Sequence, residues 1–264
     1  MLPLSDFPIE ARRRIRGVFC DIDDTLTTGG RLTADAYAAM ERLERAGLLV
    51  VPITGRPAGW CDHIARMWPV AAVVGENGAF FFRYDRGRRA MKRAFVDDAA
   101  QRAANRERLR TIAADIVRAV PGCAIAADQL YRETDLAIDY CEDVTRLSRE
   151  AVDRIVALMQ ARGLTAKVSS IHVNGWFGAY DKLAATRRLA REEFRADLDA
   201  TRESYVFVGD SPNDAPMFAF FPHSVGVANI REFAGRLAHE PRYVTAGGGG
   251  AGFCEVAELL LAGR

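Results

Sequence analysis

The sequence predicts an α/β protein with a doubly wound parallel sheet and a second, inserted domain. Short apolar runs alternate with amphipathic stretches over residues 1–83, which is typical of a parallel sheet covered by helices. The pattern changes over residues 84–175 and resumes from Asp181. We therefore expect a Rossmann-like core built from residues 1–83 and 176–264, with a separate α/β domain of residues 84–175 between its two parts.

The elements of the first part follow from the period of the apolar residues. The run 18–20 predicts a first strand, and apolar side chains at helical spacing predict a helix over 33–46 that a glycine ends. A second strand over 48–53 completes a strand–helix–strand unit. Beyond it we expect a short helix over 57–67 and a third buried strand over 71–74.

The middle region has shorter, alternating segments. A long helix is predicted over 103–120, followed by strands over 123–127, 135–140 and 165–169 around a helix over 148–162. This arrangement is typical of a small sheet with helices on one face.

The last part returns to the first pattern. The expected elements are, in order, a helix over 181–195, a strand over 205–208, a helix after Pro212, a strand over 224–227, a helix over 231–239, a short strand at Tyr243 and a helix over 255–261. We expect the glycine run 247–250 to be a flexible loop. Linkers near 82–83 and 175–180 would let the inserted domain close over the core.

Composition excludes several classes of function. The chain has 36 Lys and Arg against 35 Asp and Glu, a net charge of +1, so we expect neither nucleic acid nor a membrane surface as partner. No CxxC pair is present, which argues against a disulfide framework and a thiolate zinc site; the cysteines are Cys20, Cys61, Cys123, Cys141 and Cys254. We expect a cytoplasmic monomer or homodimer that acts on a small metabolite.

Polar residues follow the predicted core strands at the points where these strands end. Asp21, Thr54 and Asp210 each come directly after a strand or one residue beyond it. Because open α/β sheets bind ligands at the carboxyl ends of their strands, we expect these segments to meet in one crevice. Taken singly, each aspartate is explained as well by a helix cap or a turn, and Lys182 by a solvated side chain.

At these residues the sequence resembles the haloacid dehalogenase superfamily of phosphatases and phosphotransferases. Residues 21–27 (DIDDTLT) resemble its DxDxT motif, and residues 54–57 (TGRP) resemble its second motif. Lys182 lies where the third motif has lysine, and residues 209–214 (GDSPND) resemble the fourth motif. The insertion resembles the cap of subgroup IIB, which includes Cof-like sugar phosphatases and sucrose-phosphate phosphatases, and residues 76–79 resemble the ENGA segment of that subgroup.

The resemblance implies hydrolysis of a phosphomonoester with Mg²⁺ through an aspartyl-phosphate. Asp21 would be the nucleophile and a metal ligand, and Asp210 a second ligand. Asp23 would be the acid and base, with its backbone carbonyl on the metal. Thr54 and Lys182 would contact the oxygens of the transferring phosphoryl group, where negative charge develops.

Further residues are expected around these groups. The resemblance places Asn213 and Asp214 next to the metal ligands, and Asp24 stands where many relatives have glycine. Candidate substrate contacts come from the core and from the end of the insertion: Gly55, Arg56, Asn77, His172 and Asn174. For His172, a purely structural histidine is the alternative.

The substrate is expected to be a small phosphorylated metabolite, most plausibly a sugar phosphate. A phosphomutase or phosphotransferase of the same fold, which would return the phosphoryl group to a sugar, is the alternative. A catalytically silent binding module is a third reading, which predicts loss of the nucleophile or of the lysine. Asp21 and Lys182 are both present.

Overall fold

The computed structural model of the chain describes residues 1–263, so residue 264, the last of the predicted core range, lies outside the described residues. The strands are β1 (Leu2–Pro3), β2 (Gly17–Cys20), β3 (Thr27–Thr28), β4 (Arg31–Leu32), β5 (Leu49–Pro52), β6 (Val73–Gly75), β7 (Phe80–Asp85), β8 (Ala90–Phe95), β9 (Ala124–Ile125), β10 (Asp135–Asp139), β11 (Thr165–Val168), β12 (His172–Trp176), β13 (Tyr205–Gly209), β14 (His223–Gly226) and β15 (Tyr243–Val244). The α-helices are α1 (Ile9–Arg14), α2 (Ala34–Arg45), α3 (Ala58–Met67), α4 (Ala99–Ala119), α5 (Arg149–Ala161), α6 (Lys182–Glu193), α7 (Leu198–Thr201), α8 (Ala215–Phe220) and α9 (Gly249–Ala262). Short 3₁₀ turns are η1 (Leu4–Asp6), η2 (Glu76–Gly78), η3 (Ala127–Tyr131), η4 (Arg202–Ser204), η5 (Pro212–Asp214) and η6 (Ala228–Phe233).

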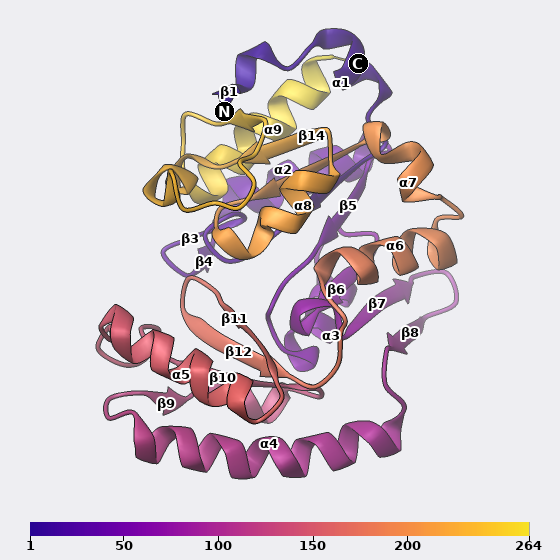
Figure 1. Ribbon diagram of the computed structural model, residues 1–264. Helices are drawn as coiled ribbons and strands as arrows, with labels where there is room; N and C mark the ends of the chain where they lie inside the picture. The colour runs from indigo at the N-terminus through magenta and orange to yellow at the C-terminus, as the bar shows by residue number, and fades with distance from the viewer. Residues whose placement is uncertain (264) are drawn as a thin grey trace.

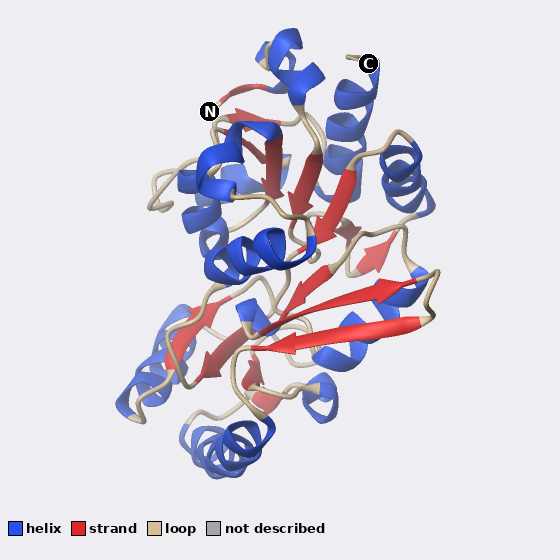
Figure 2. Ribbon diagram, turned by 90° about the vertical axis from the view of Figure 1, so that its right-hand side faces the viewer, coloured by secondary structure: helices blue, strands red, loops and turns tan. Residues whose placement is uncertain are grey.

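The core is a parallel sheet in the order β1-β15-β14-β13-β2-β5. A parallel bridge between Ile53 and Val74 joins it to the antiparallel sheet β6-β7-β8. Helices cover both faces of the parallel sheet (Figure 2). The predicted α/β class with a doubly wound parallel core is therefore confirmed.

The central strands are apolar because both of their faces are covered. Val18 and Val206 pack with α2, α3 and α9, whereas the adjacent Phe19 and Phe207 pack with α6 and α8. Successive side chains of a strand point to opposite faces, so a strand between two helical layers needs apolar residues at every position. The short apolar runs in the sequence are therefore explained by the burial of these strands on both faces.

Residues 99–176, from α4 to β12, form a second unit, here called the inserted unit. Its sheet has the order β11-β12-β10-β9 and is antiparallel. The helices α4 and α5 lie on one face, where Ile112 and Ile155 pack against Leu136 and Ile138 of β10. Figure 1 shows this unit below the core, with α4 along its outer edge. The opposite face of the sheet is turned toward the core.

A hairpin of β7 and β8 lies where the sequence suggested the start of the insertion. Phe82 pairs with Arg93 and Arg83 pairs with Lys92, so the expected hinge near 82–83 is wrong. The many arginines concealed this hairpin, because their charged ends lie outside while the phenylalanines are buried. The domain limits of 84 and 175 stay a prediction, and we propose that the insertion starts after Phe95.

The glycine run is packed against the core rather than being a flexible loop. Gly249 has a φ of +53° and begins α9. A Cβ atom there would lie 2.6 Å from the carbonyl oxygen of Thr27, and one on Gly250 would lie 2.9 Å from that of Leu26. Glycine therefore allows α9 to approach the loop that carries Asp21.

Two smaller differences concern local structure. The helix expected over 231–239 is a 3₁₀ turn, η6, that ends at Phe233, and the two-residue strands β3 and β4 were not predicted. Within residues 1–263, none of the helices has both the length and the apolar character needed to span a bilayer.

Candidate active site

The candidate site lies at the carboxyl ends of neighbouring core strands. Asp21 directly follows β2 and Asp210 directly follows β13, and Cys20 is in register with Val208 across this strand pair. The amide of Asp21 donates to the carbonyl of Val208 at 2.9 Å. Sheet pairing thus places both aspartates side by side, as their position after the strands predicts.

Lys182 supplies the positive charge next to Asp21. It is the first residue of α6, whose N-cap is Asp181. Its Nζ donates to Asp21 Oδ1 at 2.6 Å and to Asp214 Oδ1 at 2.9 Å. Burial lowers the pKa of Lys182, but these two carboxylates outweigh it and raise the pKa above its ordinary value. Lys182 is therefore an ammonium ion that links the first, third and fourth motifs.

Three buried carboxylates meet at this point. Oxygens of Asp21, Asp210 and Asp214 lie within 4.8 Å of one another. Burial raises the pKa of Asp21 to about 7, and burial together with Asp21 and Asp214 raises the pKa of Asp210 well above its ordinary value. One ammonium does not balance three carboxylates, and hard oxygen donors of this kind suit a divalent cation such as Mg²⁺. Asp214, expected beside the ligands, belongs to the cluster itself.

Asp210 is held by neighbours from other segments. Thr25 Oγ1 donates to its Oδ1 at 3.2 Å, and its own amide donates to Asp214 Oδ2 at 3.2 Å. Asn229 Nδ2 lies 3.4 Å from Asp210 Oδ2 and donates to the carbonyl of Asp24 at 3.0 Å. Asn229 also accepts from the amide of Gly249 at 3.0 Å. These contacts fix the Asp210 carboxylate relative to the loop that follows β2 and to the glycine run.

Sequence reasoning missed Asn229. It lies three residues after the end of β14, the strand next to β13. The rule that polar residues at the carboxyl ends of core strands form the site would have found it if it had been applied to this strand.

Asp24 takes a backbone conformation that favours glycine. Its φ is +56°, and its amide donates to Thr27 Oγ1 at 3.0 Å. Aspartate is one of the residues that tolerates this region, so the charge at this position is compatible with the fold. Burial raises the pKa of Asp24.

Arg56 holds the carboxylate of Asp23. Its Nε and Nη2 donate to Asp23 Oδ1 at 3.0 and 2.9 Å, and its guanidinium lies 4.5 Å from the ring centre of Trp60. Nη2 also donates to Glu142 Oε1 at 2.9 Å. The expected contact of Arg56 with the substrate stays a prediction.

The other predicted core residues surround this loop. Thr54 is buried, and its hydroxyl accepts from the amide of Arg56 at 3.0 Å. The carbonyl of Gly55 accepts from Arg132 at 2.9 Å. Asn77 has a φ of +56°, and its buried Nδ2 has no hydrogen-bond partner within the described chain. A Cβ atom on Gly55 would lie 3.2 Å from that nitrogen, so a free amide donor faces the loop.

The predicted residues of the inserted unit also reach the site. His172 Nε2 lies 2.9 Å from Glu142 Oε2, and Asn174 Nδ2 donates to Asp135 Oδ2 at 3.0 Å. Both side chains are buried. From the core, Asn213 accepts from the hydroxyl of Ser211 at 2.6 Å.

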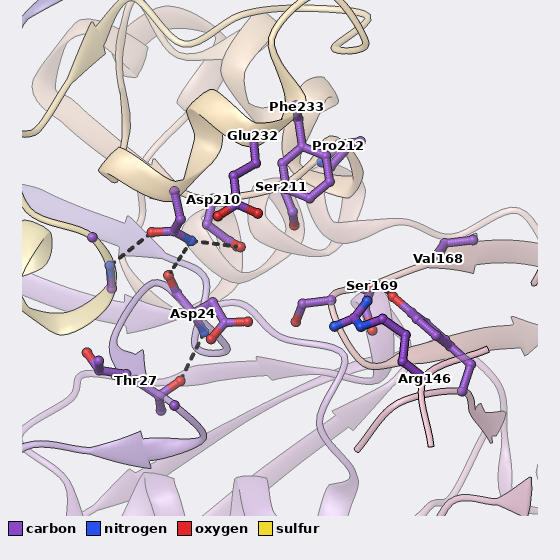
Figure 3. A pocket seen from close by; sticks show the side chains of 17 residues that line it. Asp24, Thr27, Arg146, Val168, Ser169, Asp210, Ser211, Pro212, Glu232 and Phe233 are labelled. Carbon is purple, nitrogen blue, oxygen red and sulfur yellow. Dashed lines mark hydrogen bonds between the residues drawn. The ribbon is translucent and has the colours of Figure 1, made fainter. Parts of the chain in front are cut away.

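Two cavities meet at the site. A pocket of about 20 Å³ is lined by residues of both units: Asp21, Asp23, Gly55, Arg56, Arg132, Ser169, Ser170, Ile171, His172, Asn174, Ser211 and Asn213. A larger cavity of about 700 Å³ shares Ser169, Ser170 and Ser211 with it. Figure 3 shows the larger cavity, with Asp24, Asp210 and Glu232 on one side and Arg146 across from them. The larger cavity has room for an organic group attached to a phosphate.

The site and the fold agree with what comparison with known proteins finds. A sequence model of the haloacid dehalogenase-like hydrolase family matches residues 15–221, and the chain belongs to this family. A phosphoglycolate phosphatase of Pyrobaculum neutrophilum is 28% identical over 246 residues, which cover 92% of this chain and 94% of that protein. The expected enzyme class, a phosphatase of the haloacid dehalogenase type, is confirmed.

Solved structures share the whole arrangement, inserted unit included. The crystal structure of Thermoplasma acidophilum 0175 matches this structure with a TM-score of 0.69 and 20% sequence identity. The match covers 94% of this chain and 98% of that chain. Sucrose-phosphatase of Synechocystis sp. PCC6803, solved with sucrose and phosphate, has a TM-score of 0.64 and 14% identity, with 94% and 98% covered. The solved neighbours also include a sugar phosphatase of subclass IIB. The fold expected from the resemblance to that subgroup is therefore confirmed.

Proposed function

We propose that the protein hydrolyses a phosphomonoester of a small metabolite with Mg²⁺, through a phosphoryl group carried by Asp21. One observation carries the proposal: the buried Asp21 carboxylate accepts a hydrogen bond from the Lys182 ammonium and forms an acidic cluster with Asp210 and Asp214 at the ends of β2 and β13. A carboxylate attacks a phosphate dianion only where cations neutralise both partners. The site offers one such cation, the Lys182 ammonium, and the carboxylate oxygens that could bind a second.

The oxygen donors suit Mg²⁺ as the second cation. The carboxylates of Asp21 and Asp210 and the backbone carbonyl of Asp23 would hold it, with Asp214 beside them. The bound ion would neutralise charge shared by the nucleophile and the phosphate.

The residues of the chain can perform both steps of the reaction. In the first step, an Asp21 oxygen forms a bond to phosphorus, the ester P–O bond breaks, and the leaving oxygen takes a proton from Asp23. In the second step, Asp23 takes a proton from water while the water oxygen attacks phosphorus. The bond to Asp21 then breaks and phosphate leaves. Lys182 stabilises negative charge on the oxygens in both transition states.

A sugar phosphate is the substrate class that the larger cavity supports. Hydroxyls of Ser169, Ser170 and Thr28 and charged groups of Asp24 and Arg146 line a space of about 700 Å³, which exceeds the need of a two-carbon acid. Such a lining suits a polyhydroxy leaving group. The name of the Pyrobaculum relative makes phosphoglycolate the second candidate, and it supports transfer to water rather than to a sugar.

Phosphate release tests the proposal. Purified protein with Mg²⁺ is incubated with sugar phosphates, phosphoglycolate and nucleotides, and Asp21→Asn serves as the inactive variant. We expect release from at least one substrate, its loss with EDTA, and its loss in Asp21→Asn. Normal turnover by Asp21→Asn would refute the assignment. A cytoplasmic location and a monomeric or homodimeric state stay predictions.

A further inference from the structure

We propose that Glu142 is a positioning residue that couples closure of the inserted unit to the placement of Asp23, acting through Arg56. The inference rests on the proposed function, because it concerns the acid and base of that reaction. It assigns a role to a residue of the inserted unit that contacts neither the nucleophile nor the acidic cluster.

Arg56 connects the two units at the site. Its side chain is 6% exposed and contacts three carboxylates: Asp23 of the core at 2.9 Å, and Glu142 at 2.9 Å and Asp128 at 3.6 Å from the inserted unit. The face of Trp60, a core residue, supports its guanidinium. Two of its three acidic partners therefore leave if the inserted unit moves away.

Glu142 is the partner best placed to orient Arg56. Asp128 is already committed to Arg132, which donates to both of its oxygens at 2.9 Å. Glu142, by contrast, accepts from Nη2 of Arg56, the nitrogen that also donates to Asp23. The neighbouring His172 and Arg56 lower the pKa of Glu142 to about 2, so it carries its charge at neutral pH. Nη2 of Arg56 thus donates both to Asp23, the proposed acid and base, and to Glu142 of the inserted unit.

The small catalytic pocket points to a movement of the inserted unit during turnover. The pocket that contains Asp21 and Asp23 has a volume of about 20 Å³, which holds about one water molecule. A phosphomonoester does not fit while Ser170, His172 and Asn174 form the other wall. Substrate entry therefore requires this wall to withdraw, and Glu142 withdraws with it.

The consequence is that Nη2 of Arg56, which donates to Asp23, is held from both units only in the closed state. Without Glu142, the guanidinium of Arg56 keeps Asp23 and Trp60 as neighbours but loses the contact that fixes Nη2. A long side chain regains rotational freedom when such a contact is lost. Closure then excludes water and orients Asp23 in the same movement.

Leaving-group dependence tests this coupling. Glu142→Gln keeps the shape of the side chain and removes its charge, and Asp143→Asn is the matched control, because the Asp143 carboxylate makes no hydrogen bond or ion pair with the other described residues. Each variant is assayed with an alkyl phosphate, whose leaving oxygen needs a proton, and with p-nitrophenyl phosphate, whose leaving group does not. For the aryl ester, the first-turnover burst of p-nitrophenolate reports the first step alone.

We expect Glu142→Gln to lower kcat for the alkyl phosphate about tenfold or more, part of the 10²–10⁴ that general acid–base catalysis contributes. The burst with p-nitrophenyl phosphate should change by less than about threefold, since that step needs little acid catalysis. Asp143→Asn should match the wild type with both substrates. Equal losses with both substrates, or no loss, would overturn the inference. A wild type that releases phosphate from neither ester and from none of the sugar phosphates, phosphoglycolate and nucleotides would refute the proposed function instead, and this inference with it.

Discussion

Replacing Lys182 with methionine should destabilise the protein by about 3–5 kcal/mol at pH 8 in the absence of Mg²⁺, the cost of removing one partner of a buried ion pair. Lys182 Nζ contacts Asp21 at 2.6 Å and Asp214 at 2.9 Å, and the three side chains are at most 8% exposed. Methionine keeps a similar length and the apolar stem. The loss then comes from two carboxylates that stay buried without their counter-ion.

The loss should depend on pH in a defined direction. The folded pKa of Asp21 is about 7, above an unfolded value of about 3.9, so the folded state binds more protons between these values. Stability therefore falls as pH rises through this window. The Lys182 ammonium lowers the pKa of Asp21, so removing it raises that pKa further and extends the fall in stability to higher pH. The destabilisation should accordingly be smaller at pH 5 than at pH 8.

Urea unfolding with EDTA present, at pH 5 and at pH 8, measures this difference. The control is Lys92→Met, which removes an ammonium whose side chain is 51% exposed, while its partner Glu193 keeps the contact with Arg83. An exposed ammonium of this kind contributes under about 1 kcal/mol. If Lys182→Met and Lys92→Met had equal stability at pH 8, the electrostatic reasoning about the site would be refuted.

Three further predictions concern the cation and its surroundings. Adding Mg²⁺ should raise the melting temperature more at pH 8 than at pH 5, because protonated carboxylates bind it poorly; an equal rise at both values would contradict this. Gly249→Ala should lower the free energy of unfolding in urea by about 1–3 kcal/mol, because residue 249 has a positive φ and the new Cβ would lie 2.6 Å from the carbonyl oxygen of Thr27. Gly235→Ala, at a φ of +74° with open space around it, should cost less. The reverse order would be evidence against the packing argument. Asn229→Ala should weaken Mg²⁺ binding, measured by calorimetry, about 10- to 100-fold by releasing Asp210, and unchanged affinity would remove Asn229 from the site.

Features that depend on local pattern were the ones that the sequence predicted best. The apolar runs marked the central strands, and the parallel pairing of β2 with β13 brought Asp21 and Asp210 together without any knowledge of side-chain contacts. Lys182 was placed by its resemblance to a motif, and the structure brings its ammonium to Asp21. Strand ends are predictable because the sheet fixes where they meet.

Contacts between distant segments were beyond the same reasoning. Glu142 lies in a loop of the inserted unit, and its contact with Arg56 depends on how two separately folded units pack. The β7–β8 hairpin was missed because its arginines and lysine pair with acidic residues from other elements, such as Lys92 with Glu193. Charge pattern along one segment does not reveal such partners.

The covalent intermediate on Asp21 is the central claim, and trapping it tests the claim most directly. Wild-type protein and Asp21→Asn are mixed with Mg²⁺ and a substrate that is turned over, quenched in acid within the first turnover, digested, and analysed by mass spectrometry. The account predicts a phosphoryl group on the peptide that contains residue 21 in the wild type and none in the variant. A phosphoryl group on another residue, or rapid phosphate release with no modified peptide, would contradict it.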